Sequence, residues 1–197
     1  MVDLFAGDLT ASAAMRKRGW DVVSVDLLWG DDVMKWKWDR RPVDLLWASP
    51  PCEKFSVAGH FKHFRYFGDR AFPIDDEGQY ALRLVERAFQ IRRQMRPKFF
   101  VLENPRGLLR KLIGPPTATT WYCQFGDERA KPTDLWMIPQ DGPDGFLPLP
   151  TCRNRATDHA TAPRGAKTGT QGRKGIARAA VPYNLSERLC LAVERHA

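Results

Sequence analysis

The segment VDLLWASPPC (residues 43–52) joins a mostly apolar run to a Ser-Pro-Pro stop. Successive prolines fit neither a strand interior nor a helix interior, so the strand expected at residues 43–48 ends there. The prolines also fix the backbone before Cys52, and a thiol on a rigid loop just past a strand can be aimed at a substrate. The alternative is that Cys52 is simply a small buried apolar side chain.

Three further strand-like runs accompany this segment, at residues 2–6, 21–28 and 98–102. Helix-period patterns at about residues 10–18 and 77–95 lie between strands, and another covers residues 185–193. Continuous apolar strands that alternate with helices are typical of a parallel sheet buried on both faces. The sequence therefore predicts an α/β fold with a doubly wound, mostly parallel sheet.

Polar residues stand where each of these strands ends. Gly7 and Asp8 follow the first, Asp26 closes the second, Cys52 follows the third and Glu103 follows the fourth. Open parallel sheets bind ligands at this edge, and a right-handed crossover would place Glu103 beside Cys52. A carboxyl group in a water-poor pocket can stay protonated and donate a hydrogen bond to a ring nitrogen. Alternatively, Glu103 is satisfied by backbone amides or exposed.

The segment DLFAG (residues 3–7) is typical of a strand–turn–helix opening in which a glycine lets a ligand approach the backbone closely. Asp26 lies about 20 residues onward, where nucleotide-binding sheets place the acceptor for a ribose hydroxyl. Only one glycine of the usual pair is present, so an ordinary structural turn is the alternative.

The last part of the chain is rich in loops and positive charge. Prolines and glycines predict irregular structure from residue 115 to about residue 175. The chain has 31 Lys and Arg against 23 Asp and Glu, a net charge of +8, which favours a polyanionic partner or else a solvated basic surface. We expect a catalytic core at residues 1–136, a loop-rich basic segment at 137–176 and a helix packed back on the core at 177–197.

Composition narrows the class of protein. Hydrophobic residues make up 43% of the 197 residues, enough for a core, so global disorder is excluded. No run reaches the about 20 apolar residues of a membrane span, and no signal peptide is predicted. Four widely spaced cysteines without a CxxC pair indicate a reducing, intracellular compartment. His60 and His63 are interpreted as loop or DNA-facing residues rather than ligands, and no metal is predicted.

Four motifs occur together in a family-specific order: DLFAG at residues 3–7, GDD at 30–32, DLLWASPPCEKFSVAG at 44–59 and ENPRG at 103–107. In these motifs the chain resembles the cytosine-5 DNA methyltransferases. CQFGDERAKPTDLW at residues 123–136 and the APRG and GTQG tail segments resemble the short methylases of bacteriophages. The resemblance implies a Rossmann-like methyltransferase fold, encoded by a phage or prophage and acting in the cytoplasm of a bacterial host, for example in restriction-modification.

The resemblance also implies a site for S-adenosylmethionine. Phe5 would stack on the adenine and Gly7 would make room for the cofactor. Asp26 would hold the ribose hydroxyls, and Asp31 would meet the adenine amino group. The other expected cofactor-binding residues are Asp3, Ala6, Pro51 and Asn184.

Covalent catalysis on double-stranded DNA follows from the same resemblance. Cys52 would add to C6 of cytosine, Glu103 would contact N3 and the exocyclic amine, and Arg129 would support the activated base. The target base would be flipped out of the duplex into the pocket. The expected DNA contacts are Ser56, Lys131, Arg164, Lys167, Arg173 and Lys174.

Two other functions remain open at this point. Ser-Pro-Pro followed by an aromatic residue is the signature of N4-cytosine and N6-adenine amino methyltransferases, although Cys52 takes the place of that aromatic here. The second alternative is a DNA-binding protein that keeps the methyltransferase fold but has lost catalytic activity. It is suggested because the chain has no large target-recognition domain and Lys131 stands where the family has a second arginine. Residues from about 137 to 176 would have to read the DNA sequence themselves, unless specificity is relaxed or an accessory specificity subunit or a homo-oligomer supplies it.

Overall fold

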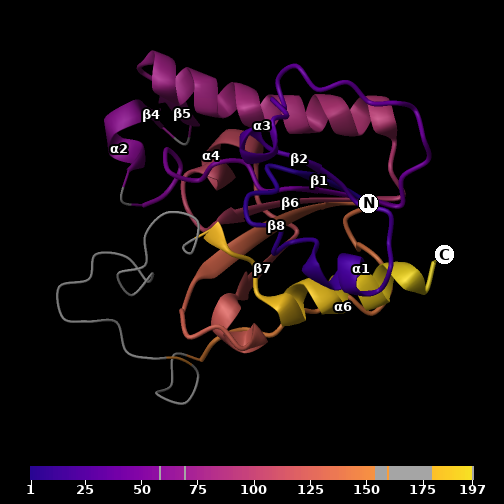
Figure 1. Ribbon diagram of the computed structural model, residues 1–197. Helices are drawn as coiled ribbons and strands as arrows, with labels where there is room; N and C mark the ends of the chain where they lie inside the picture. Colours follow the sequence, from indigo (N-terminus) through magenta and orange to yellow (C-terminus); the bar gives the residue numbers. More distant parts are fainter. Residues whose placement is uncertain (58, 69, 154–158, 160–178, 197) are drawn as a thin grey trace.

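The computed structural model describes residues 1–57, 59–68, 70–153, 159 and 179–196. Its centre is a six-stranded sheet in the order β2-β1-β3-β6-β8-β7 (Figure 1). The four strands β2, β1, β3 and β6 run parallel to one another. They span Val23–Val25, Val2–Leu4, Leu45–Ala48 and Phe99–Pro105, respectively. The predicted α/β fold with a mostly parallel sheet is confirmed.

Two strands at one side of the sheet were not predicted. β8 (Pro132–Ile138) pairs antiparallel with β6, and β7 (Ala118–Trp121) pairs antiparallel with β8. The prediction of loop-rich structure throughout residues 115–175 is therefore wrong for both. β8 is buried along its five central residues because it lies beside β6, a contact that proline and glycine content does not reveal. The core boundary expected after residue 136 falls inside this strand.

Helices cover both faces of the sheet (Figure 1). One face packs on α3, and the other packs on α1 and α6. Within β3, Leu46 and Ala48 pack in the core between the sheet and α3, whereas Leu45 and Trp47 pack in the core on the side of α1 and α6. Successive side chains of a strand point to opposite faces of the sheet. Because helices cover both faces here, every residue of the strand is buried and apolar. The helices span Ala13–Lys17 (α1), Asp76–Met95 (α3) and Tyr183–Glu194 (α6).

The smaller elements lie between these. An antiparallel hairpin of β4 and β5 follows the short helix α2, and α4 follows β6. Asp75 caps α3, since its side chain accepts a hydrogen bond of 2.7 Å from the Gly78 N–H. The bounds are His60–His63 (α2), Phe64–Phe67 (β4), Arg70–Pro73 (β5) and Leu109–Ile113 (α4), with 3-10 helices at Leu27–Trp29 (η1) and Tyr122–Phe125 (η2).

β6 is longer than predicted. The sequence places its end at residue 102, whereas the strand continues to Pro105 because β8 pairs with it as far as that residue. Glu103 and Asn104 are therefore held in place by backbone pairing with β8.

Among the described residues, no helix has the length and hydropathy to cross a membrane, and no group of three or more His, Cys, Asp or Glu is placed to hold a metal ion.

Candidate active site

Cys52 and Glu103 meet at the carboxyl edge of the sheet. Their strands β3 and β6 are parallel neighbours, with Ala48 opposite Leu102. The loop after Ala48 and the end of β6 therefore leave the sheet side by side. Both side chains line one cavity of about 110 Å³. The structure thus brings together the two residues that the strand order predicts to be neighbours.

Residues after the β6 midpoint hold the loop that carries Cys52. The Asn104 side-chain amide donates a hydrogen bond of 2.9 Å to the Pro50 carbonyl. The Leu108 N–H donates one of 2.9 Å to the Phe55 carbonyl, so the loop is tied down on both sides of the cysteine. A Cβ at Gly107 would stand 2.4 Å from that same Phe55 oxygen, which explains the glycine at this position.

A tyrosine orients Glu103. The Tyr122 hydroxyl donates a hydrogen bond of 2.9 Å to Glu103 Oε1, and both residues are buried. Burial, and then the neighbouring Glu103 carboxylate, raises the pKa of Tyr122 well above its usual value, so the phenol remains a donor. Sequence reasoning missed this residue because no motif marks it and it lies 19 positions from its partner.

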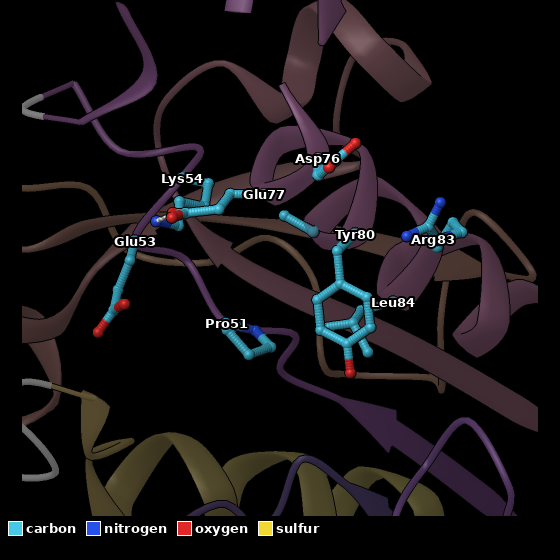
Figure 2. Close-up of a pocket in the computed structure, with 9 residues that line it drawn as sticks. Pro51, Glu53, Lys54, Asp76, Glu77, Tyr80, Arg83 and Leu84 are labelled. Atoms are coloured by element: carbon cyan, nitrogen blue, oxygen red, sulfur yellow. Dashed lines mark hydrogen bonds and ion pairs between the residues drawn. The ribbon is translucent and has the colours of Figure 1, made fainter. Parts of the chain in front are cut away.

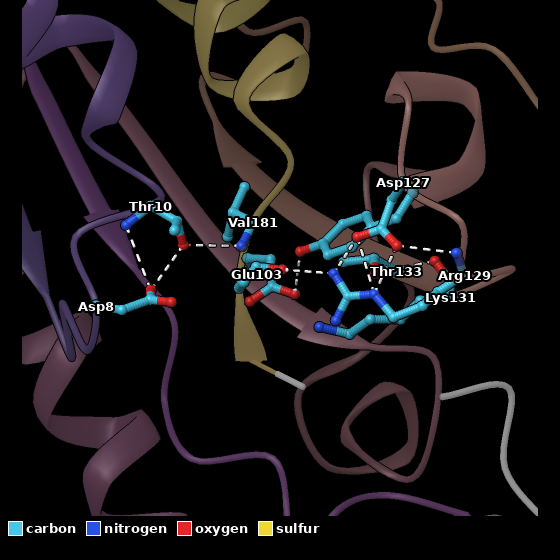
Figure 3. Close-up of polar contacts among 10 residues, drawn as sticks. Asp8, Thr10, Glu103, Asp127, Arg129, Lys131, Thr133 and Val181 are labelled. Atoms are coloured by element: carbon cyan, nitrogen blue, oxygen red, sulfur yellow. Dashed lines mark hydrogen bonds and ion pairs between the residues drawn. The ribbon is translucent and has the colours of Figure 1, made fainter. Parts of the chain in front are cut away.

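Arg129 lies behind this pair and is only 1% exposed. Its Nε donates to both carboxylate oxygens of Asp127, at 2.7 and 2.8 Å, and its Nη2 donates to the Ala180 carbonyl at 3.1 Å. Its guanidinium carbon is 5.7 Å from the Tyr122 ring centroid. Arg129 is not among the described residues that line the cavity of Cys52 and Glu103. Arg129 therefore packs behind Tyr122, where it can hold the tyrosine in position beside Glu103. Figure 3 shows Arg129 and Glu103.

Lys131, expected as a DNA contact, is buried rather than on the protein surface. It is 6% exposed and lines the same small cavity as Cys52 and Glu103. Its Nζ lies 4.5 Å from the Tyr122 ring centroid, a cation–π distance. The expectation is corrected accordingly: the lysine adds positive charge to the pocket itself.

A larger cavity of about 510 Å³ adjoins the first, and Pro51 and Cys52 line both. Phe5, Gly7 and Asp26 line it at the ends of β1 and β2. The Asp26 carboxylate accepts hydrogen bonds from the Gly7 N–H (3.1 Å) and the Leu28 N–H (2.8 Å). The bond to Gly7 joins the segment after β2 to the segment after β1. Gly7 has a φ of 49°, a conformation that favours glycine.

The chemistry of this larger cavity suits a nucleoside. It combines an aromatic ring (Phe5), carboxylates (Asp26 and Asp32) and apolar wall residues (Val33 and Leu84). Its volume falls within the range of about 300–1,000 Å³ that is usual for small-molecule sites. Asp32 takes the place expected for Asp31, which is exposed beside the cavity. Sequence reasoning also missed Tyr80 and Leu84 of α3 and Ala179, which line this cavity.

Asn184 and Asp3 lie outside both cavities. Asn184 donates a hydrogen bond of 3.1 Å to the Phe125 carbonyl and lines a separate hollow of about 400 Å³. Asp3 is fully buried and, within the described part of the chain, neither of its carboxylate oxygens has a hydrogen-bond partner. Burial raises the pKa of Asp3 to about 7.

The remaining predicted residues are placed as follows. Ala6 and Pro51 line the small cavity, and the Ser56 hydroxyl donates to the Glu53 carbonyl at 3.2 Å. His63 does not face outward as expected: its Nδ1 is 2.7 Å from Asp75 Oδ2 and its side chain is 14% exposed. Four predicted DNA contacts lie outside the described residues: Arg164, Lys167, Arg173 and Lys174.

Comparison with known proteins places this geometry in context. Residues 2–125 match the family described as C-5 cytosine-specific DNA methylase. A protein of Frog virus 3 (isolate Goorha), named "Probable DNA (cytosine-5)-methyltransferase", is 31% identical over 199 residues. That alignment covers 90% of this chain and 91% of the viral protein.

Proposed function

Because this chain belongs to the C-5 cytosine-specific DNA methylase family, we propose that Cys52 is the nucleophile of a DNA (cytosine-5)-methyltransferase and that Glu103 and Lys131 bind its target base. The activity and the methyl donor, S-adenosylmethionine, follow from the family. The assignment of residues rests on one observation, the shared cavity of Cys52, Glu103 and Lys131.

The larger cavity is the proposed cofactor site. Phe5 offers a ring for stacking, and the Asp26 and Asp32 carboxylates can accept hydrogen bonds from hydroxyl and amino groups. When bound there, S-adenosylmethionine supplies an electrophilic methyl group. Since Pro51 and Cys52 line both cavities, the methyl donor and the base would meet at the cysteine loop.

The proposed role of Cys52 is covalent catalysis. Carbon C5 of cytosine is a poor nucleophile, and addition of the Cys52 thiolate to C6 turns it into an enamine-like carbon. As C5 takes up the methyl group, the bond from that group to the sulfonium sulfur of the donor would break and leave a neutral thioether. Transfer of the C5 proton to water as the base then restores the double bond and expels the cysteine. The sulfur–carbon bond formed in the first step is thus broken in the last, and the thiolate is regenerated.

Glu103 and Lys131 would stabilise the base during that addition. Electron density moves into the ring when the thiolate adds, so an acid at N3 and a cation beside the ring lower the barrier. The Tyr122 hydroxyl holds one carboxylate oxygen of Glu103, which leaves the other to face the base. Arg129 is a positioning residue in this scheme, because it supports Tyr122 from behind.

The substrate is DNA, and its target base must leave the helix to reach Cys52. We further propose that the part of the chain after β8, residues 139–176, forms a minimal recognition segment and that Arg164, Lys167, Arg173 and Lys174 bind phosphates, as their charge suggests. A bacterial cytoplasm and a phage origin are part of the same proposal; the viral relative comes from Frog virus 3.

Mechanism-based trapping tests the role of Cys52. The wild-type protein should form a denaturation-resistant adduct with DNA that carries 5-fluorocytosine, because fluorine at C5 blocks the final elimination. Cys52→Ser should form no adduct and transfer no labelled methyl group, while it binds S-adenosylmethionine normally. Cys123→Ser, at a half-buried cysteine that lines neither cavity, serves as the matched control and should behave as wild type. Methyl transfer to C5 without any trapping by the wild type would overturn the covalent mechanism.

A further inference from the structure

The β4–β5 hairpin presents two different faces. The register pairs Arg65 with Phe72 and Phe67 with Arg70. Because side chains alternate along a strand, these four residues share one face, here named the outer face. The opposite face carries Phe64 and Ala71, which are 1% and 7% exposed, together with Pro73 and with Tyr66, which is 49% exposed. The hairpin therefore packs Phe64 and Ala71 against the core and leaves the outer face to solvent.

The outer face combines exposed aromatic rings with cations. Phe67 is 71% exposed and Phe72 is 45% exposed, and their rings meet edge to face at 5.9 Å. Arg65 and Arg70 are also exposed. The two strands themselves, residues 64–67 and 70–73, contain no Asp or Glu, although Asp69 stands between them in the sequence. Aromatic side chains interleaved with arginines are typical of surfaces that bind nucleic acid, where cations meet phosphates and rings stack on bases.

Arg65 is held ready for such a contact. Its Nη1 donates to the carbonyl oxygens of Phe61 and Phe64, at 2.5 and 3.1 Å. A guanidinium has five N–H donors on three nitrogens, so these bonds fix its direction and still leave donors for an anion. Less side-chain freedom is then lost when a phosphate binds.

The base of the hairpin is linked to the cysteine loop. The Ile74 N–H donates to the His63 carbonyl at 2.9 Å, and His63 Nδ1 lies 2.7 Å from Asp75 Oδ2. Lys54, two residues after Cys52, has its Nζ at 3.2 Å from His63 Nε2 and forms an ion pair with Glu77 (Figure 2). Phe55 and Phe64 add a ring contact at 5.8 Å.

The hairpin also lies on the side of the molecule where the substrate must arrive. β4 and β5 lie with α2 at the end of the molecule away from the N-terminus (Figure 1). β1 starts next to the N-terminus, and β2, β3 and β6 run in the same direction, so this end is the carboxyl edge of these four strands. A duplex engaged by the Cys52 pocket would therefore pass close to the hairpin.

We propose that the outer face is a DNA-binding surface in which Arg65 and Arg70 bind phosphates and Phe67 and Phe72 pack on bases exposed where the target cytosine leaves the stack. This inference rests on the proposed function, which requires a flipped base. A vacated position in a duplex exposes the faces of its neighbouring bases, and aromatic side chains replace lost stacking there. The positive charge of the outer face suits the negative charge of DNA. Each of its two arginines lies opposite a phenylalanine on the paired strand.

Binding measurements on two duplexes test this proposal. One is an intact duplex, and the other has the same sequence with a single nucleotide missing, which imitates the vacated position. The wild type should bind the gapped duplex more tightly. The Phe67→Ala/Phe72→Ala variant should lose that preference, with affinity for the gapped duplex reduced about tenfold or more. The Arg65→Gln/Arg70→Gln variant should bind both duplexes more weakly and reduce the slope of log K against log salt by about 2.

Matched controls separate this from general effects. Lys37→Gln/Arg93→Gln makes the same change in charge at exposed positions elsewhere, and Leu191→Ala removes an exposed apolar side chain of α6. Both should leave the two affinities unchanged, and all variants should bind S-adenosylmethionine as wild type does.

Two results would overturn the proposal. The first is that both hairpin variants bind both duplexes with the same affinity as the wild type. The other is a change from dimer to monomer on loss of the two phenylalanines without any change in DNA affinity, which would assign the face to a second copy of the chain. Trapping by 5-fluorocytosine reports on Cys52 independently, so failure of the proposed function would be recognised separately.

Discussion

The Asn104 side-chain amide and the Pro50 carbonyl form a hydrogen bond of 2.9 Å that joins the strand of Glu103 to the loop of Cys52. Both groups are withdrawn from solvent, and the Asn104 side chain is 1% exposed. The two groups proposed to act on opposite sides of one base are thus held by a single contact between neighbouring segments. It depends on β6 continuing past residue 102, which the pairing with β8 provides.

We predict that Asn104→Ala slows methyl transfer by about 10- to 100-fold, because small displacements of a catalytic group have effects of this size. The unpaired Pro50 carbonyl should also lower the free energy of unfolding by about 1–3 kcal/mol. Single-turnover methyl transfer and chemical denaturation measure the two effects, and S-adenosylmethionine affinity should not change. A variant with wild-type rate and stability would show that the bond does not position the loop.

Two adjacent aspartates should differ in their effect on cofactor binding. Asp32 lines the larger cavity, and its Oδ1 accepts a hydrogen bond of 2.9 Å from the Met34 N–H, which fixes the carboxylate. Asp32→Ala should weaken S-adenosylmethionine binding about tenfold or more, as expected for a hydrogen bond to a charged group. Asp31→Ala, the matched control, should change the affinity less than about twofold. Titration calorimetry measures both, and the reverse order would restore the role predicted for Asp31.

The positive charge of Lys131 should matter for chemistry. Lys131→Met keeps the length of the side chain and removes its charge, and we expect it to lower the single-turnover rate about 100-fold. Lys131→Arg should recover part of that loss, and Lys35→Met, at a lysine whose side chain is 86% exposed, should have no effect. Equal rates for Lys131→Met and the wild type would exclude a role for this cation in the pocket.

Protein stability should depend on pH through Asp3. Burial raises the pKa of Asp3 to about 7 in the folded state, against about 3.9 for an unfolded aspartate. Between these values the folded state binds more protons than the unfolded state, so stability falls as the pH rises from about 4 to 7. The loss is complete above pH 7 and amounts to at most about 4 kcal/mol.

Asp3→Asn should remove this part of the pH dependence, which denaturant unfolding at pH 5 and pH 8 measures. The matched control is Asp8→Asn, at an exposed aspartate, and it should keep the wild-type difference between the two pH values. A difference that is unchanged in Asp3→Asn would show that Asp3 is ionised in the folded protein.

The central sheet could be predicted because its strands carry their own signals. Residues 43–48 are apolar on both faces and are stopped by two prolines, so their burial and their end are both readable in the chain. β8 is different. It begins with a proline in a region dense in prolines and glycines, and its burial comes from β6, about 30 residues earlier in the chain.

The sequence by itself determined the parallel sheet, its carboxyl edge and the meeting of Cys52 with Glu103, because chain direction and local periodicity are sufficient to specify them. Only the tertiary structure decided that Asp32 rather than Asp31 lines the larger cavity, that Lys131 lies inside the pocket and that Tyr122 holds Glu103. The physical reason is that the burial and partners of a side chain depend on segments distant in the chain, which no local pattern encodes.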